Sequence, residues 1–434
     1  MSKPSGAIDM TQGKPINLML RFALPMMIGS IFQSLYSMVD SAVLGRFVGS
    51  HALAAIGATT STTGLILLLA TGVTSAISIV LSQYVGANDT DRVRKGIVAS
   101  GWITLLLGVV LGLISVFAAR PLMQLLKTPE DVIDMSVLYI QIVCGCGIAQ
   151  FAYNAAASIL RALGDSKTPL YFLVFSSVLN IILDIVFIVP MHMGVAGAAW
   201  ATILSQFLSA VFSTVVGLRN FPILHLRRED FHDLKGAAVL HLKTGFPMGF
   251  QMSVMCIGQL AMQAVVNSLG TAAVAGYTAA SKADQLSVLV NNAMMTAISN
   301  YVAQNFGAGK KDRIRLGVRA SLIQTEAFNI LMCIGILLLR HPIVELFLSN
   351  PTAEIYHYSD VFLTIEAPFY FLLGLLAVYR TSIQSMQNGR APFAACMIEL
   401  VMRLAATVWL SRFLGYTAVC IASPLAWFGA IALL

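Results

Sequence analysis

Long apolar runs alternate with short polar segments along almost the whole chain. Most runs are long enough for an α-helix to cross the hydrocarbon core of a bilayer, and the longest predict tilted or projecting helices. Twelve such runs predict an all-α membrane protein with twelve transmembrane helices. Their approximate bounds are 16–45, 52–84, 93–118, 131–159, 168–190, 195–217, 245–267, 273–304, 314–339, 356–383, 392–411 and 415–434.

Two segments of the chain are similar to each other. QYVGANDTDRVRKGIVAS (83–100) aligns without gaps to QNFGAGKKDRIRLGVRAS (304–321), with nine of eighteen positions identical. With single-residue gaps, two prolines of the first half also find partners: Pro25 with Pro247 and Pro169 with Pro392. The chain therefore reads as a duplication of a six-helix unit. Six is even, so both copies have the same orientation, which predicts two pseudo-twofold-related six-helix bundles and a central cleft.

The duplication predicts three parts. Residues 1–217 form an N-terminal six-helix lobe, residues 218–244 a cytoplasmic linker, and residues 245–434 a C-terminal six-helix lobe. In the linker an apolar stripe lies between charges, which predicts a short amphipathic helix on the inner membrane surface. The stripe consists of Phe231, Leu234, Ala238 and Leu242.

Composition supports the membrane class. The chain is 57% hydrophobic and 11% charged, with a mean hydropathy of +0.80, whereas soluble domains carry about 25% charged residues. The net charge of +7 comes from short loops and does not indicate nucleic-acid binding. The polar N-terminus lacks the apolar core of a signal peptide, so the first helix reads as a permanent span.

The loops also predict the orientation. Most Lys and Arg residues fall in the loops of one side, which the positive-inside rule makes cytoplasmic, with both termini inside. The opposite side holds five basic residues, namely Arg46, Arg120, Lys127, Arg340 and Arg412. They fall where an even number of helices would place the outer loops.

The first predicted helix carries a carboxylate. No charge occurs from Phe22 to Val39, and Asp40 follows directly. An acidic residue within a membrane span costs roughly 2.5–3.5 kcal/mol, so it usually faces a cavity or a partner. Its helical neighbours on the same face are polar: Ser37, Tyr36 and Gln33. Asp40 reads either as an ion-coupling carboxylate on a helix that can bend at Pro25 or as a helix-end residue reaching the headgroups.

A second acidic residue lies at a similar depth. Asn180 and Asp184 are four residues apart on the fifth predicted helix, so they share a face. Two carboxylates at one depth can form a shared cation or proton site. Tyr139 and Thr202 lie at the same depth. They either belong to this site or make ordinary interhelical hydrogen bonds. Asn154 lies deeper on the same helix as Tyr139, so its link to the pair is weaker.

The duplication supplies an internal control. Asp40 aligns with Met262, Asn180 with Arg403, and Asp184 with Thr407. A packing role would be kept in both halves, so the asymmetry favours a function specific to the first half.

The second half has polar groups of its own. Glu399 with Arg403, and Lys282 with Asp284, read as internal ion pairs. Methionines are abundant on the first and seventh predicted helices, where they suit varied apolar ligands or lipid-facing packing equally well. Gln33, Tyr36 and Met262 are candidates for a substrate wall. The apolar lining with few basic residues predicts amphipathic, cationic organic substrates.

Four sequence features together carry a resemblance to a known family. They are LPMMIGSIFQSLYSMVDSAVLGRFVG, LRALGDSKTP, LNIILDIVFI and the duplicated Q-x-x-GA…DR-x-R signature. Over essentially its whole length the chain resembles the multidrug and toxic compound extrusion (MATE) family of bacterial transporters.

The resemblance implies a drug-efflux antiporter of the bacterial inner membrane, working by alternating access and coupled to inward H⁺ or Na⁺. It implies no cofactor, small-molecule drugs and membrane lipid as partners, no nucleic acid, and a monomer. In this family the acidic and polar cluster of the first lobe carries cation coupling. The matching residues here are Asp40, Asn180 and Asp184, which are also the candidates for Na⁺, with Tyr139, Asn154 and Thr202 as neighbours.

Two other functions are alternatives for such a chain. A flippase of lipid-linked saccharides, from the related superfamily, would line its cavity with arginines that hold pyrophosphate, and here only Arg403 and Arg380 could do so. A membrane-embedded enzyme would need a catalytic constellation, and the chain has no H-E-x-x-H, G-x-S-x-G or P-loop lysine. We therefore expect a transporter rather than an enzyme.

Overall fold

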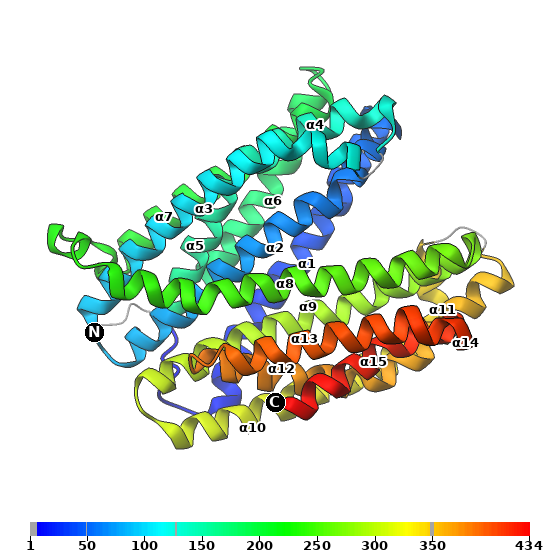
Figure 1. Cartoon of the computed structure of the whole chain (residues 1–434). Helices are drawn as coiled ribbons and strands as arrows, with labels where there is room; N and C mark the ends of the chain where they lie inside the picture. Colours follow the sequence, from blue (N-terminus) through cyan, green and yellow to red (C-terminus); the bar gives the residue numbers. More distant parts are fainter. Residues whose placement is uncertain (1–6, 49, 126–127, 348–350) are drawn as a thin grey trace. The chain divides into compact units, whose positions relative to one another are not determined.

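In the computed structural model the chain is helical almost throughout (Figure 1). The structure describes residues 7–48, 50–125, 128–347 and 351–434, and no strand occurs among them. The predicted all-α class is confirmed. Some side chains within the helices lie outside the described set, and Ser37 on the Asp40 face is one of them: residues 35, 37, 38, 41, 42, 44–46, 50–54, 60–62, 65 and 286.

The first half of the chain contains seven helices among the described residues. They are α1 (Pro15–Phe47), α2 (Ser50–Gly86), α3 (Thr90–Leu125), α4 (Glu130–Gly145), α5 (Ile148–Ala162), α6 (Lys167–Ile188) and α7 (Gly194–Asn220). Two 3₁₀ turns follow, η1 (Pro222–Leu224) and η2 (Arg228–Phe231).

The second half repeats the order. It contains α8 (Lys235–Ser268), α9 (Thr271–Gly307), α10 (Lys311–Phe347), α11 (Ala353–Glu366), η3 (Ala367–Phe369), α12 (Tyr370–Ser385), α13 (Arg390–Leu404), the π-helical segment η4 (Ala405–Leu410), α14 (Ser411–Leu414) and α15 (Tyr416–Leu433).

Each of the twelve predicted spans corresponds to one helix or to helices joined end to end. By length and apolar composition, ten described spans can cross a membrane, and the pair α4 and α5, bent by 40°, makes up to eleven. The remaining predicted span is α9, which carries Lys282 and Asp284.

The fourth predicted span of each half is interrupted near its middle. The span predicted over 131–159 is divided into α4 and α5 at Cys146 and Gly147, and the one predicted over 356–383 is divided by η3. Gly147 fits the first break because a Cβ there would lie 2.9 Å from the carbonyl oxygen of Cys144. In the second half Pro368 lies within η3 and removes a helical donor.

The duplication is also visible in the backbone. The turn after α2 and the turn after α9 each contain one residue with positive φ, Asn88 (56°) and Gly309 (69°). Each turn closes with a matching bond, from Asp89 N to Tyr84 O (3.1 Å) and from Lys310 N to Asn305 O (2.9 Å). This is the pattern of a helix C-terminus capped by a left-handed residue.

The linker differs from the amphipathic helix predicted for it. Asp233 has a positive φ of 55°, and the residues from Lys235 onward belong to α8. The apolar stripe is therefore divided, with Phe231 in η2 and Ala238 and Leu242 in the first turns of α8. A left-handed residue interrupts helical geometry, which accounts for the division.

The chain forms two compact units. Among the described residues, the first comprises 7–10, Leu24–Gly249 and Gly307–Gly309, and the second comprises Thr11–Ala23, Phe250–Phe306 and Lys310–Leu434. Thus α1 begins in the second unit and continues in the first, whereas α8 begins in the first and continues in the second. The division into lobes 1–217 and 245–434 stays a prediction.

Specific contacts hold the start of α1 and the residues just before it in the second unit. Gln324 Nε2 on α10 donates to Ile16 O (2.8 Å), and Arg313 Nη2 donates to Gly13 O (3.0 Å). In the first unit, Gly72 on α2 meets Gly249 on α8, where a Cβ on Gly72 would lie 2.4 Å from the Gly249 Cα. Paired glycines let two helix backbones approach this closely.

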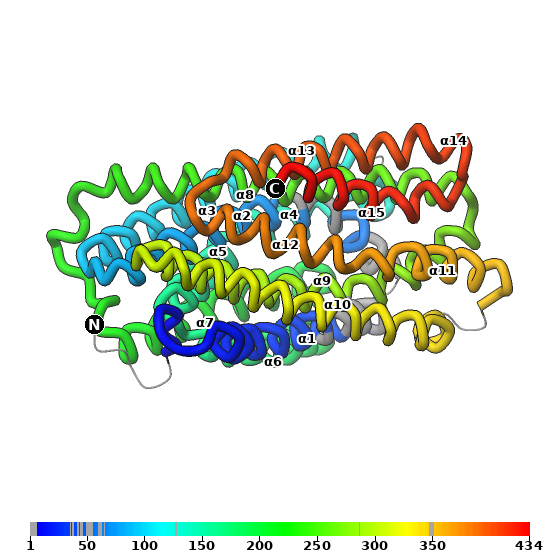
Figure 2. The backbone as a smooth tube through the Cα atoms, turned by 90° about the horizontal axis from the view of Figure 1, so that it is seen from below, coloured from blue at the N-terminus to red at the C-terminus, as the bar shows by residue number. Residues whose placement is uncertain are grey.

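Within each unit the long helices pack side by side. In the first unit α6 packs on α7, α3 on α4, and α2 on α5 (Figure 1). In the second unit α13 packs on α15, and α10 on α12 (Figure 2). The second unit's core includes Val266, Tyr370 and Trp427, each buried.

Candidate functional site

Asp40 and Asp184 come together in the first unit. Asp184 on α6 is completely buried, and Asp40 on α1 is partly buried. Their carboxyl groups are within hydrogen-bonding reach of each other. Two carboxyl groups can share a hydrogen bond only when one of them carries a proton, because an ionised carboxylate is an acceptor only. A proton, or another cation, between the two groups would satisfy both of them.

Asn180 connects the pair to α7. It lies one turn before Asp184 and is 2% exposed. In the amide orientation that satisfies both ends, its nitrogen donates to Asp184 Oδ2 (3.3 Å) and its oxygen accepts from the Thr202 backbone N–H (3.2 Å). In the opposite orientation the nitrogen donates to Thr202 Oγ1 (3.5 Å). Either way, Asn180 joins α6 to α7 beside the carboxyl pair.

Two tyrosines complete the surroundings. Tyr36 on α1 and Tyr139 on α4 both lie close enough to Asp40 and Asp184 to interact with their charges. Asn154 on α5 is partly buried, and none of the contacts of the described residues connects it to the pair. The structure therefore brings together five of the predicted coupling residues and Tyr36, while Asn154 stands apart.

The donor set suits a proton or a hard cation. Asp40 Oδ1 and Asp184 Oδ1 are buried and have no hydrogen-bond partner among the described residues. Carboxylate, amide and hydroxyl oxygens are the ligands that hard cations prefer. The residues fit Na⁺ as well as H⁺, and at either ion Asp40, Asp184 and Asn180 would supply the nearest oxygens.

The predicted wall residues do not gather in one place. Gln33 is exposed on α1, whereas Met262 on α8 is 3% exposed and belongs to the core of the second unit. Ser423 Oγ on α15 lies 3.9 Å from the Met262 sulfur. A role of Gln33, Tyr36 and Met262 in substrate binding stays a prediction.

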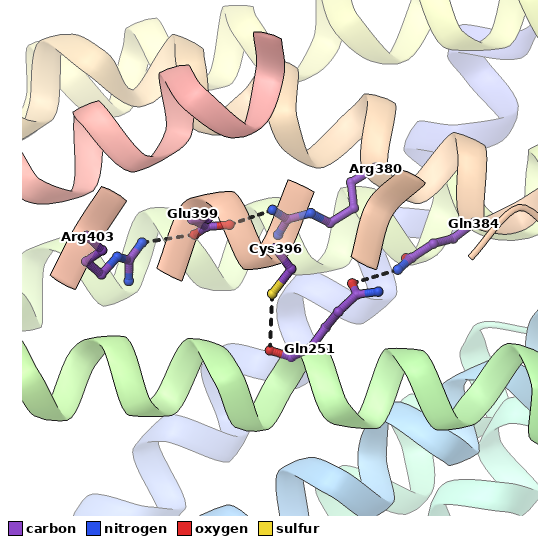
Figure 3. Close-up of polar contacts among 6 residues, drawn as sticks. All are labelled: Gln251, Arg380, Gln384, Cys396, Glu399 and Arg403. Atoms are coloured by element: carbon purple, nitrogen blue, oxygen red, sulfur yellow. Dashed lines mark hydrogen bonds and ion pairs between the residues drawn. The ribbon is translucent and has the colours of Figure 1, made fainter. Parts of the chain in front are cut away.

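The second unit holds a buried charge cluster (Figure 3). Glu399 accepts from Arg403 Nη2 through Oε1 (3.0 Å) and from Arg380 Nη2 through Oε2 (2.5 Å). The predicted Glu399–Arg403 ion pair is thus confirmed. The hydrogen bond from Arg380 to Glu399 was not predicted, because Arg380 lies 19 residues before Glu399, on α12. Its position inside an apolar span could have indicated a buried partner, because arginine is rare there and is usually paired.

The cluster continues towards α8. Gln384 Nε2 donates to Gln251 Oε1 (2.8 Å), and Cys396 Sγ lies 3.8 Å from the Gln251 carbonyl oxygen (Figure 3). These contacts join α8, α12 and α13. These contacts were not predicted, because the sequence around a glutamine in an apolar helix does not indicate which residue on another helix it contacts.

The predicted ion pair between Lys282 and Asp284 is wrong. Lys282 is exposed, and no ion pair joins Lys282 and Asp284 among the described residues. Residues two apart on a helix face different directions, which explains the error.

Comparison with known proteins gives consistent results. A family model described as MatE matches residues 25–186 and 247–409, one stretch in each half. The chain is 31% identical over 411 residues to the probable multidrug resistance protein YpnP of Bacillus subtilis (strain 168), covering 94% of this chain and 89% of that protein.

Solved structures share the fold. One is the outward-facing conformation of a multidrug resistance MATE family transporter of the MOP superfamily, with a TM-score of 0.91, 22% identity, and 99% of this chain and 96% of that chain covered. Another is a MOP superfamily transporter from Pyrococcus furiosus, with a TM-score of 0.88, 21% identity, and 100% and 96% covered.

Proposed function

The chain belongs to the multidrug and toxic compound extrusion (MATE) family of membrane transporters, and we propose that it is a cation-coupled antiporter that exports amphipathic organic compounds. Members of this family are transporters and not enzymes. The observation that carries the proposal is the contact between Asp40 and Asp184 in the first unit.

We infer that the coupling ion enters this carboxyl pair. Without it, two negative charges would face each other in a buried site, which is costly. A proton or Na⁺ removes the repulsion, and Asn180 then holds Asp184 against α7. The ion can drive a conformational change only by binding one state more tightly than the other.

The element that responds would be α1. It carries Asp40, and Pro25 within it removes one backbone hydrogen bond, which permits a bend. In an alternating-access cycle, ion binding from outside would change the conformation of α1 and release the exported compound outward. The bacterial relatives support a location of this cycle in the cytoplasmic (inner) membrane, and the loop charges support a cytoplasmic position of both termini.

The export of drugs is supported by the relatives' names. YpnP is called a probable multidrug resistance protein, whereas the Pyrococcus furiosus title speaks of reversed pocket polarity and a different function for that protein. The flippase alternative is not favoured, because both Arg380 and Arg403 engage Glu399. A pyrophosphate would have to compete with that carboxylate.

The coupling ion is testable in proteoliposomes. We expect that an imposed inward gradient of H⁺ or of Na⁺ will increase transport of the cationic dye rhodamine 123 at least tenfold over the rate without a gradient. The two gradients are applied separately, so the productive one identifies the ion. Empty liposomes under the same gradients are the control. Equal dye movement with and without each gradient would contradict the antiporter proposal.

A further inference from the structure

The segment before α1 is bound to both units. Residues 7–13, called the N-terminal strap, begin in the first unit and end in the second, because the boundary between the units falls between Met10 and Thr11. The strap lies on the side of the N-terminus, which the loop charges support as cytoplasmic. The mechanism proposed above does not use it.

The first anchor of the strap is Gly164, in the turn between α5 and α6. Ile8 N donates to Gly164 O (2.9 Å), Ala7 packs against the apolar core of the first unit, and Met10 is completely buried. Gly164 has a positive φ of 93°, and a Cβ there would overlap the carbonyl oxygen of Ile8. Only glycine therefore lets the strap lie against this turn.

The second anchor is the start of α10, in the second unit. Lys310 Nζ donates to Thr11 O (3.0 Å), and Arg313 Nη2 donates to Gly13 O (3.0 Å). Arg313 is itself held in place, because its Nε donates to Asn305 Oδ1 (3.1 Å). Hydrogen bonds from charged donors are stronger than those between neutral groups, so this anchor is the firmer of the two.

The strap is too short to follow a large movement while both anchors hold. Ile8 and Thr11 are three residues apart, so even a fully extended chain limits their separation to roughly 11 Å. Neither of the two residues between them is glycine or proline. The other places where the chain passes between the units do have such residues nearby: Pro25 in α1, Pro247 in α8 and two glycines in Gly307–Gly309.

We propose that the N-terminal strap is a conformational latch, bound to both units in this structure, that leaves Gly164 when the units separate on the cytoplasmic side during transport. The anchor at Gly164 is the one that opens, because a neutral backbone hydrogen bond holds Ile8 there, whereas cationic side chains hold Thr11 and Gly13. The proposal rests on the alternating access proposed above and names a segment that must dissociate in each cycle.

Cross-linking each anchor in turn tests the latch. Ile8→Cys with Lys167→Cys joins the strap to the first unit, and Thr11→Cys with Lys310→Cys joins it to the second. Each pair is bridged in the purified full-length protein with the flexible reagent bismaleimidohexane, and mass spectrometry confirms the bridge. In proteoliposomes we expect the first bridge to reduce gradient-driven transport of rhodamine 123 about tenfold or more, and the second to change it less than about twofold. The parent protein and the single-cysteine variants, treated identically, control for the six native cysteines.

Gly164→Ala tests the first anchor without any gradient. Because Met10 is completely buried, Met10→Cys should react slowly with fluorescein maleimide in detergent. Adding Gly164→Ala should make this reaction about tenfold faster, since the new Cβ displaces Ile8 and exposes the strap. Gly270→Ala is the matched control, because Gly270 also has a positive φ (103°) but nothing lies within 4 Å of a Cβ there. It should leave the reaction rate unchanged.

Three results would overturn the latch. They are transport at the parent rate after a confirmed bridge between positions 8 and 167, equal inhibition by the two bridges, and equal labelling of Met10→Cys with and without Gly164→Ala. None of them would contradict the proposed antiport, because the unbridged parent protein is measured separately. Conversely, if the unbridged parent protein moves no dye under either gradient, the antiport proposal fails while the labelling rates in detergent still report on the anchor at Gly164.

Discussion

Asp40→Asn should abolish gradient-driven efflux while the protein still folds and inserts. Asparagine has almost the same shape as aspartate, but it cannot release or take up a proton and offers no charge to Na⁺. We expect transport of rhodamine 123 under the productive gradient to fall at least tenfold, to the level of empty liposomes. The measurement is initial dye transport in proteoliposomes at matched protein levels.

The carboxyl pair also predicts the behaviour of Asp184→Asn. In the proposed coupling site the two groups share one cation and either substitution leaves a single carboxylate, so Asp184→Asn should abolish coupling or shift its pH dependence. Asp134→Asn is the matched control, since Asp134 is an exposed carboxylate of α4 that pairs with Arg120. If Asp40→Asn and Asp184→Asn both transport like the parent protein under every gradient, the coupling site is elsewhere.

Gly72→Ala should destabilise the protein by about 3 kcal/mol, near the upper end of typical overpacking costs. A Cβ on Gly72 would lie 2.4 Å from Gly249 Cα and 2.5 Å from Gly249 N. Both are backbone atoms, so no side-chain rotation can relieve the clash, and α2 and α8 would have to separate. The expected result is a clearly lower midpoint of thermal unfolding in detergent.

Gly64→Ala tests the same substitution on the same helix. Nothing lies within 4 Å of a Cβ built at Gly64. Alanine is favoured over glycine within a helix by about 1 kcal/mol, so this variant should be as stable as the parent protein or slightly more stable. Equal midpoints for Gly72→Ala and Gly64→Ala would mean that the glycine contact with α8 does not stabilise the first unit.

The fold was largely predictable because membrane spans follow from local hydropathy. The span predicted over 168–190, for example, corresponds to α6 at Lys167–Ile188. Hydropathy says little about backbone breaks, so the one between α4 and α5 was missed. Conversely, two helices continue where the predicted spans end. α3 and α10 extend beyond the spans predicted there and contain Pro121 and Pro342 in their extensions.

The site was predictable only in part. Asp40 and Asp184 were expected at one depth because each lies near the outer end of an apolar run, and depth can be counted along the sequence. The contact of Arg380 with Glu399 depends on how α12 and α13 are rotated about their axes. No periodicity in a single helix contains that information. The same holds for Gln251, which meets Gln384 from α8.

The first turns of α1 and α8 have a consequence for synthesis at the ribosome. The first unit includes α8 up to Gly249, so it is still incomplete when α1 to α7 have emerged. In turn, the segment Thr11–Ala23 is made about 300 residues before Gln324, so it has to wait for α10 before Gln324 can bind Ile16. Domains of a growing chain usually fold in order, the first before the second. Here the two units must mature together, late in translation.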